Sequence, residues 1–163
     1  MPRTVLGAAT RYAARGNTPL LWIPKAAMSD GNLTTAILDA TTTVDLTCSV
    51  AAMSGFNATQ ADMPAGDWCS QKIGTVPGDI TLAESSLTFY LSKNGSDDVR
   101  EVLHTDDEGY LLIADGGLVA GNLADLCHVT VKYGTKVRED VARITVPFSV
   151  GNIDENVVIP ALS

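Results

Sequence analysis

Residues that could carry out catalysis are few in this sequence and do not cluster. The two histidines, His104 and His128, fall in different predicted elements, and neither forms a recognisable nucleophile–base arrangement. The sequence contains no GxSxG motif, no HExxH motif and no glycine loop suited to phosphate. Three consecutive carboxylates at residues 106–108 do not match the spacing of an EF-hand, so a solvated loop is the simpler interpretation. We therefore expect no catalytic residue, no metal site and no cofactor.

The cysteines also argue against a metal or disulfide framework. Cys48, Cys69 and Cys127 are an odd number at wide spacing, without a CxxC pair. Cys48 and Cys127 fall on the apolar side of predicted strands, so we expect both to be buried, reduced thiols. Cys69 follows Trp68 in a predicted loop and is the candidate for a reactive thiol.

Charge and hydropathy limit the class of protein further. The formal net charge of -8 disfavours tight binding to nucleic acid, because an acidic surface repels phosphates. The same repulsion would suit a conduit through which DNA slides. The sequence has no apolar run of membrane-helix length and no signal-peptide core, which favours folding in a reducing cytoplasm and no membrane partner.

The elements that position these residues are organised around residues 85–115, which predict strand, helix, strand. Leu87, Phe89 and Leu91 alternate with polar residues, as in a half-buried strand. A short helix is expected at 97–104, with Ser96 as its N-cap and an apolar stripe on one side. The apolar run 110–114 predicts a second strand. No other convincing helix is indicated.

Further strands are predicted on both sides of this unit. The periodicity indicates strands at 20–23, 43–50, 127–133 and 142–150, all but the first with a polar face. Pro147 cannot donate a ladder hydrogen bond, which predicts an edge or a bulge at that position. The sequence therefore predicts a mainly β protein, an antiparallel β-sandwich or partial barrel with one short flanking α-helix, in a single domain over residues 1–163.

Three segments do not fit the strand pattern. Residues 1–17 predict a flexible N-terminal arm, and residues 151–163 a C-terminal tail that can add a short strand. Residues 53–80 predict a long loop, and loops of this length are usually functional or disordered. Two interpretations stay open: this loop packs on its own domain, or it is an assembly loop that packs on another subunit. The large apolar residues that would anchor such an interface are Met53, Phe56, Met63 and Trp68.

Taken together, the sequence resembles the major tail tube proteins of long-tailed, non-contractile bacteriophages. The resemblance rests on Leu87-Thr-Phe-Tyr-Leu, the helix at 97–104, Gly109-Tyr-Leu-Leu-Ile and the late strand Val141-Ala-Arg-Ile-Thr-Val-Pro-Phe-Ser-Val. It covers residues 18–150 and concerns the order of elements. Some relatives carry an extra immunoglobulin-like domain, for which this chain has no room.

The resemblance implies a structural virion protein with no catalytic residue. Such proteins form hexameric rings that stack into a hollow tube for DNA, with strands joined into an inner barrel. The implied partners are further copies of the chain, the tape measure, tail-tip and tail terminator proteins, and DNA in transient, non-specific passage. The implied location is the phage tail, assembled in the host cytoplasm. The polar strand faces expected to line the lumen comprise Thr43, Asp45, Thr47 and Ser49, and more weakly Thr130 and Lys132.

Two other functions remain compatible with the sequence. One is a free-standing β-sandwich that binds a sugar or protein, such as a capsid decoration module, although only Trp68 suggests an exposed aromatic at a loop tip. The other is a tail terminator. The state of assembly separates the three, because a decoration module stays small, a terminator stops at one ring and a tube protein polymerises.

Overall fold

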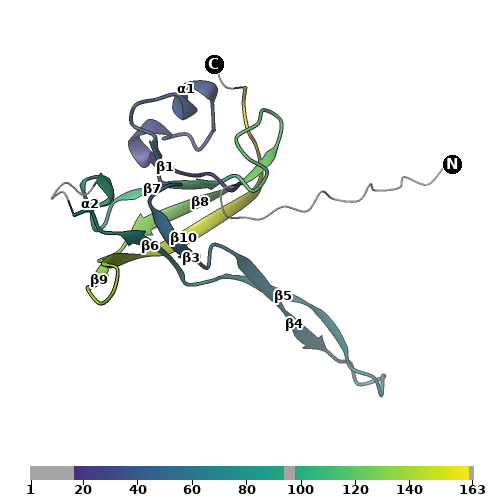
Figure 1. Ribbon diagram of the computed structural model, residues 1–163. Helices are drawn as coiled ribbons and strands as arrows, with labels where there is room; N and C mark the ends of the chain where they lie inside the picture. Colours follow the sequence, from purple (N-terminus) through teal and green to yellow (C-terminus); the bar gives the residue numbers. More distant parts are fainter. Residues whose placement is uncertain (1–16, 94–97, 162–163) are drawn as a thin grey trace.

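The computed structural model describes residues 17–93 and 98–161, and its main feature is one curled antiparallel sheet of eight strands (Figure 1). Seven strands follow the order β2-β1-β7-β8-β10-β6-β3, and β9 pairs with β10. The predicted mainly β, antiparallel architecture is confirmed, in the form of a curled half-barrel. The strands are β1 (Leu20–Pro24), β2 (Val44–Asp45), β3 (Val50–Ser54), β6 (Ser85–Tyr90), β7 (Glu108–Ile113), β8 (Leu123–Val131), β9 (Thr135–Val137) and β10 (Arg143–Val158).

Two further strands stand outside this sheet. β4 (Ala58–Ala65) and β5 (Gly74–Leu82) pair only with each other and project from the body as a long hairpin (Figure 1). The prediction of a long loop at residues 53–80 is therefore wrong. The two strands were not predicted because glycine and proline residues interrupt the alternation on which a strand prediction depends. These residues are Pro64, Gly66, Pro77 and Gly78.

The helical segments are short. The predicted helix is confirmed as α2 (Asp98–Val102), and its expected N-cap, Ser96, lies outside the described residues. The expectation of a single helix is wrong, because η1 (Lys25–Ala27) and α1 (Thr35–Leu38) follow β1. Each is a single turn, too short to show a helical period in the sequence.

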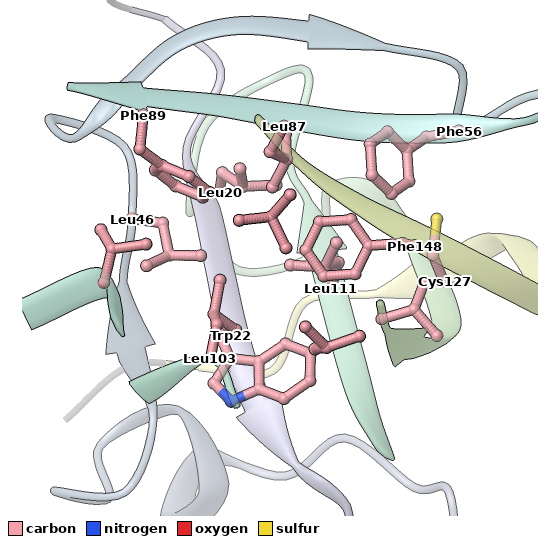
Figure 2. Close-up of a cluster of buried hydrophobic side chains, with 14 of the residues drawn as sticks. Leu20, Trp22, Leu46, Phe56, Leu87, Phe89, Leu103, Leu111, Cys127 and Phe148 are labelled. Atoms are coloured by element: carbon pink, nitrogen blue, oxygen red, sulfur yellow. The ribbon is translucent and has the colours of Figure 1, made fainter. Parts of the chain in front are cut away.

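The enclosed face of the sheet holds the main core (Figure 2). Leu87 and Phe89 from β6 are fully buried there, with Trp22 from β1 and Leu111 from β7. Gly109 lies beneath the tryptophan, where an added Cβ would come within 2.6 Å of the Trp22 ring. The predicted alternation is thus confirmed within β6, from Cys127 to the end of β8, and in the first half of β10, where the apolar residues predicted to be buried face this core. Tyr133, predicted as a further apolar member of the β8 pattern, lies beyond the end of that strand and is 79% exposed.

The opposite face is covered over only part of its area. Leu21, Leu112 and Leu126 pack there against Met28 and Ile37, which come from the η1–α1 segment. The rest of this face, formed by β6, the first half of β10 and the end of β8, carries polar side chains. The two faces therefore differ in chemistry as an antiparallel sheet allows.

The strand predicted at residues 43–50 is largely wrong. Only Val44 and Asp45 form β2, residues 47–49 turn, and β3 starts at Val50. The Asp45 carboxylate accepts a hydrogen bond from the backbone N–H of Thr47 at 2.9 Å, which closes a turn inside the apparent strand. Alternating Thr, Asp and Ser residues suit local turns as well as strands, so the pattern alone was ambiguous.

The last part of the chain continues the sheet, so the prediction of a separate C-terminal tail from residue 151 is wrong. β10 runs on to Val158 alongside β8, with register shifts after Val150 and after Asp154. Pro147 is not at an edge either, because β10 lies between β8 and β6. Its carbonyl accepts from the Lys132 N–H at 2.9 Å, just beyond the end of β8. The nitrogen and the carbonyl of one strand residue point in the same direction, so the nitrogen of Pro147, which has no hydrogen, faces a position beyond the end of the β8 ladder.

Candidate assembly surfaces

The β4–β5 hairpin exposes an unusual amount of apolar surface for a segment outside the core. Its large exposed hydrophobic residues are Met63, Trp68, Ile73, Val76 and Ile80. Scattered exposed apolar residues are normal on a protein surface, but several of them on one protruding element make this hairpin a candidate surface for contact with another molecule. Ile73, Val76 and Ile80 were not predicted as interface residues, because Pro77 and Gly78 mask the strand on which the last two lie.

The tip of the hairpin has a defined shape. The Asp67 carboxylate accepts from the Cys69 N–H at 2.9 Å, and the Ser70 hydroxyl accepts from the Lys72 N–H at 3.2 Å. These local turns present Trp68, whose side chain is fully exposed at 105% of its reference area. Along the ladder, the Gln60 amide donates to the Gly78 carbonyl at 2.6 Å beside a register shift. The hairpin thus has specific internal contacts, although few to the body.

The four predicted interface anchors separate into two groups. Met63 and Trp68 lie on the hairpin, and Met53 is 48% exposed on the edge strand β3. Phe56, in contrast, is 5% exposed and packs in the main core, with its ring centroid 5.8 Å from that of Phe148 (Figure 2). The prediction of Phe56 as an interface anchor is therefore wrong, because this side chain is buried within its own subunit.

The backbone next to Phe56 explains this placement. Gly55 and Phe56 both have positive φ, 85° and 56°, which turns the chain sharply out of β3 towards the hairpin. The Phe56 N–H donates to the Ser85 hydroxyl at 2.9 Å, and an added Cβ on Gly55 would approach the Glu84 carbonyl to 2.3 Å. A glycine before a single aromatic residue was the only sequence signal for this kink.

The uncovered part of the sheet forms a second candidate surface, which we call the polar sheet face. Thr88 and Thr145 lie side by side across β6 and β10, with their hydroxyl oxygens 3.2 Å apart. Thr130 pairs with Ser149 across β8 and β10. His128 extends the face towards β7, where it stacks on Tyr110 at a ring distance of 4.9 Å. The polar sheet face consists of Thr88, His128, Thr130, Thr145 and Ser149.

The residues predicted to line a lumen are not all brought together. Thr130 lies on the polar sheet face, and Lys132 is exposed just past the end of β8. The other four lie in β2 and in the segments on either side of it, and β1 and β7 separate β2 from β8. Two of their hydroxyls bond to the backbone of the same subunit: Thr43 donates to the Ile37 carbonyl at 2.6 Å, and Thr47 accepts from the Leu20 N–H at 3.0 Å. Assignment of Thr43, Asp45, Thr47 and Ser49 to a lumen stays a prediction.

The cysteines and acidic groups show no catalytic arrangement among the described residues. Cys127 is buried as predicted, and burial followed by the charge of Asp125 raises the pKa of its thiol to about 12. Cys48 is exposed, which contradicts its predicted burial, because it lies in the turn between β2 and β3. Cys69 is exposed at the hairpin tip. The described part of the chain has no cluster of metal-binding side chains, and none of its helices is long and apolar enough to span a membrane.

Comparison with known proteins agrees with this architecture. The sequence matches the family model of the phage tail tube protein over residues 8–162, and no curated protein matches the chain. Among solved structures, a chain in the cryo-EM structure of the anti-feeding prophage (AFP) baseplate, 6-fold symmetrised, is similar in fold. The TM-score is 0.58 at 9% sequence identity, and the match covers 90% of this chain and 96% of that chain. At this identity the likeness concerns the fold alone.

The family match extends over every part of the architecture. Its range includes the central β6–α2–β7 unit, the β4–β5 hairpin and the whole of β10. The protruding hairpin and the half-open sheet therefore both lie within the matched range, which covers almost the full length of the chain. The chain belongs to the phage tail tube protein family.

Proposed function

We propose that this chain is a structural subunit that assembles into hexameric rings, and that these rings stack into the hollow tail tube of a phage. The observation that carries the proposal is the β4–β5 hairpin, which projects from the body of the subunit (Figure 1) and exposes Trp68 and other large apolar side chains. A two-stranded hairpin is at best marginally stable by itself. A neighbouring subunit that covers this apolar surface would supply the contacts that the hairpin lacks.

The sheet itself favours a ring. It is an open half-barrel that ends in two different edges, β2 and β3. Unpaired edges invite pairing with another chain, and joining unlike edges head to tail closes a ring when the rotation fits. Sixfold closure is what the resemblance to tail tube proteins implies, and a similar fold occurs in an assembly solved with sixfold symmetrisation. A closed inner barrel would leave no edge exposed.

The lumen in this proposal is lined by polar side chains that do not hold DNA. Thr130 on the polar sheet face and the exposed Lys132 are two candidates, and β2 with the segments on either side of it contributes Thr43, Asp45, Thr47 and Ser49. Asp45 is the acidic member and would repel phosphates over roughly one Debye length, ~8 Å at physiological salt. The net charge of -8 agrees with passage of DNA without tight binding.

The proposal also sets the context in which the protein works. The tube belongs to a long-tailed, non-contractile phage, and the subunit is not an enzyme. The host cytoplasm is the place of assembly. The expected partners besides further copies of the chain are the tape measure, tail-tip and tail terminator proteins.

Electron microscopy of the purified protein tests this function against its alternatives. Negative-stain images and sedimentation are recorded as the protein concentration is raised, with and without a tail-tip complex as initiator. Hollow tubes with a regular ring spacing are the expected result. Rings that never stack would indicate a tail terminator, and a protein that stays monomeric under all conditions would indicate a decoration module; either result contradicts the proposal.

A further inference from the structure

A groove opens where the hairpin leaves the body. Its volume is about 820 Å³, and one wall is formed by Ala58, Ile80 and Leu82 at the base of the hairpin. The other wall is the second half of β10, from Gly151 to Val157. The two walls diverge from one point, because β5 leads into β6 at Ser85, which is paired with Phe148 of β10. The groove is therefore a fork between two strands, open to solvent.

The β10 wall of this groove is an unpaired strand edge. β6 pairs with β10 from Arg143 to Phe148, and β8 covers the other side of β10 as far as Val158. Beyond Phe148, the side of β10 that faces the groove has no strand partner among residues 17–93 and 98–161. Free N–H and C=O groups along such an edge accept an extended peptide as an added strand. Ile80 and Leu82 would contact its apolar side chains.

The surroundings of the groove are acidic. Asp154 and Glu155 lie on its β10 wall. Asp125, on the adjacent strand β8, has a raised pKa, first because of partial burial and then because of the charges of Asp115 and Glu155. All three causes oppose ionisation of Asp125, and none is a nearby cation. A peptide with positive charges and no carboxylates would therefore relieve repulsion at this end of the sheet.

The first residues of this chain have that composition. Residues 1–16 contain Arg3, Arg11 and Arg15 and no acidic residue, whereas residues 17–163 have eight Lys and Arg against nineteen Asp and Glu. This segment also includes Thr4-Val-Leu, a short run suited to a strand. It is thus the one basic segment of an acidic chain.

The point where this segment joins the body brings it close to the groove. Leu20 pairs with Ile113, and Ile113 pairs with Asp125, so β1 starts at the acidic end of the sheet. From β1 to β10 there are three interstrand spacings, roughly 14 Å. Sixteen residues can span up to about 53 Å when extended. The arm is therefore long enough to cross to the groove of its own subunit.

We infer that residues 1–16 bind in the groove of their own subunit, as an added strand on the free edge of β10. Because Arg15 precedes Leu20 by five residues, this binding mode brings it within reach of Asp115 and Asp125. Arg11 pairs with the carboxylates of the β10 wall, and Val5 and Leu6 contact the apolar hairpin base. This binding does not depend on tube formation, so an experiment can contradict the inference without contradicting the proposed function, and the reverse.

Hydrogen exchange measured residue by residue in the full-length protein tests the inference. The reporters are those amides of residues 151–157 that do not bond to β8, followed at low protein concentration. The double substitution Arg11→Gln/Arg15→Gln removes two charges from the arm, and Lys136→Gln/Arg138→Gln removes two from exposed positions at β9 as the matched control. A third sample adds 1 M salt, which shortens the Debye length to about 3 Å.

The inference predicts slow exchange of the reporter amides in the wild type and in the control variant. Exchange should become at least tenfold faster in the arm variant and also faster in high salt. Circular dichroism should show the same folded content in all samples, which separates loss of binding from unfolding. Exchange that is unchanged in the arm variant would overturn the inference. So would slow exchange that appears only as the protein concentration rises, because the groove would then hold an arm from a second copy.

Discussion

Replacing Trp68 by alanine should block assembly while leaving the subunit intact. The side chain is 105% exposed, so its removal takes nothing from the core and the melting temperature should not change. In a tube, a buried tryptophan removes about 150–250 Å² from water, worth at most about 4–6 kcal/mol at roughly 25 cal/mol per Å². Part of this is lost to immobilisation, and truncation of a central aromatic anchor typically costs about 2 kcal/mol or more. A loss of about 2 kcal/mol weakens subunit addition about 30-fold.

The critical concentration for tube growth measures this effect directly. Light scattering and sedimentation of polymer give the concentration above which tubes form, and the Trp68→Ala protein should require at least about 30 times more. Tyr133→Ala is a matched control, because Tyr133 is an aromatic residue that is 79% exposed in the β8–β9 connection, away from the hairpin. An unchanged critical concentration for Trp68→Ala would refute the assignment of the hairpin tip to an interface.

Three further predictions concern the subunit. Amides of residues 58–82 should exchange quickly in subunits and slowly in tubes, because the hairpin has few contacts to the body; equal exchange in both states would mean that it is stabilised within its own subunit. Phe56→Ala should lower the free energy of unfolding by about 3–5 kcal/mol, measured by urea denaturation, because it leaves a cavity in the main core; a loss below about 1 kcal/mol would contradict this placement. At pH 8, a thiol reagent should modify Cys48 and Cys69 rapidly and Cys127 only on unfolding, because the buried thiol has a pKa of about 12; rapid modification of three thiols per folded chain would be inconsistent with the core.

The parts of the fold that could be predicted from the sequence are the strands in which the alternation of apolar and polar residues shows which side faces the core. The β6–α2–β7 unit has strict alternation in Leu87 and Phe89, and its apolar side meets the core as expected. The alternation near Cys127 and Ile144 succeeded for the same reason. Apolar periodicity is reliable where one face is fully buried, because burial dominates the choice of conformation.

The hairpin and the edges could not be predicted in this way. No face of β4 or β5 is buried in the subunit, so their residues carry no alternation, and Pro77 and Gly78 favoured a loop. The opposite error occurred at Thr43 to Ser49, where alternation arose from a turn closed by Asp45. Phe56 was assigned to the interface because its burial depends on a kink at Gly55, a feature set by tertiary contacts with Ser85.

The polar sheet face was found only in part for a related reason. Thr130 was predicted because β8 alternates clearly, but Thr88, Thr145 and Ser149 join it only through the pairing of β6, β10 and β8. Strand order is a non-local property, so the sequence pattern of each strand does not reveal which polar residues share a face.

Cryo-electron microscopy of assembled tubes at a resolution that shows side chains tests the central claim most directly. The predicted result is a hollow tube of stacked rings with six subunits each, in which Thr130 of the polar sheet face points into the lumen and the β4–β5 hairpin of each subunit packs on a neighbour with Trp68 buried. Rings of another number, a polar sheet face on the outer wall, or a hairpin left in solvent with Trp68 exposed would contradict the account.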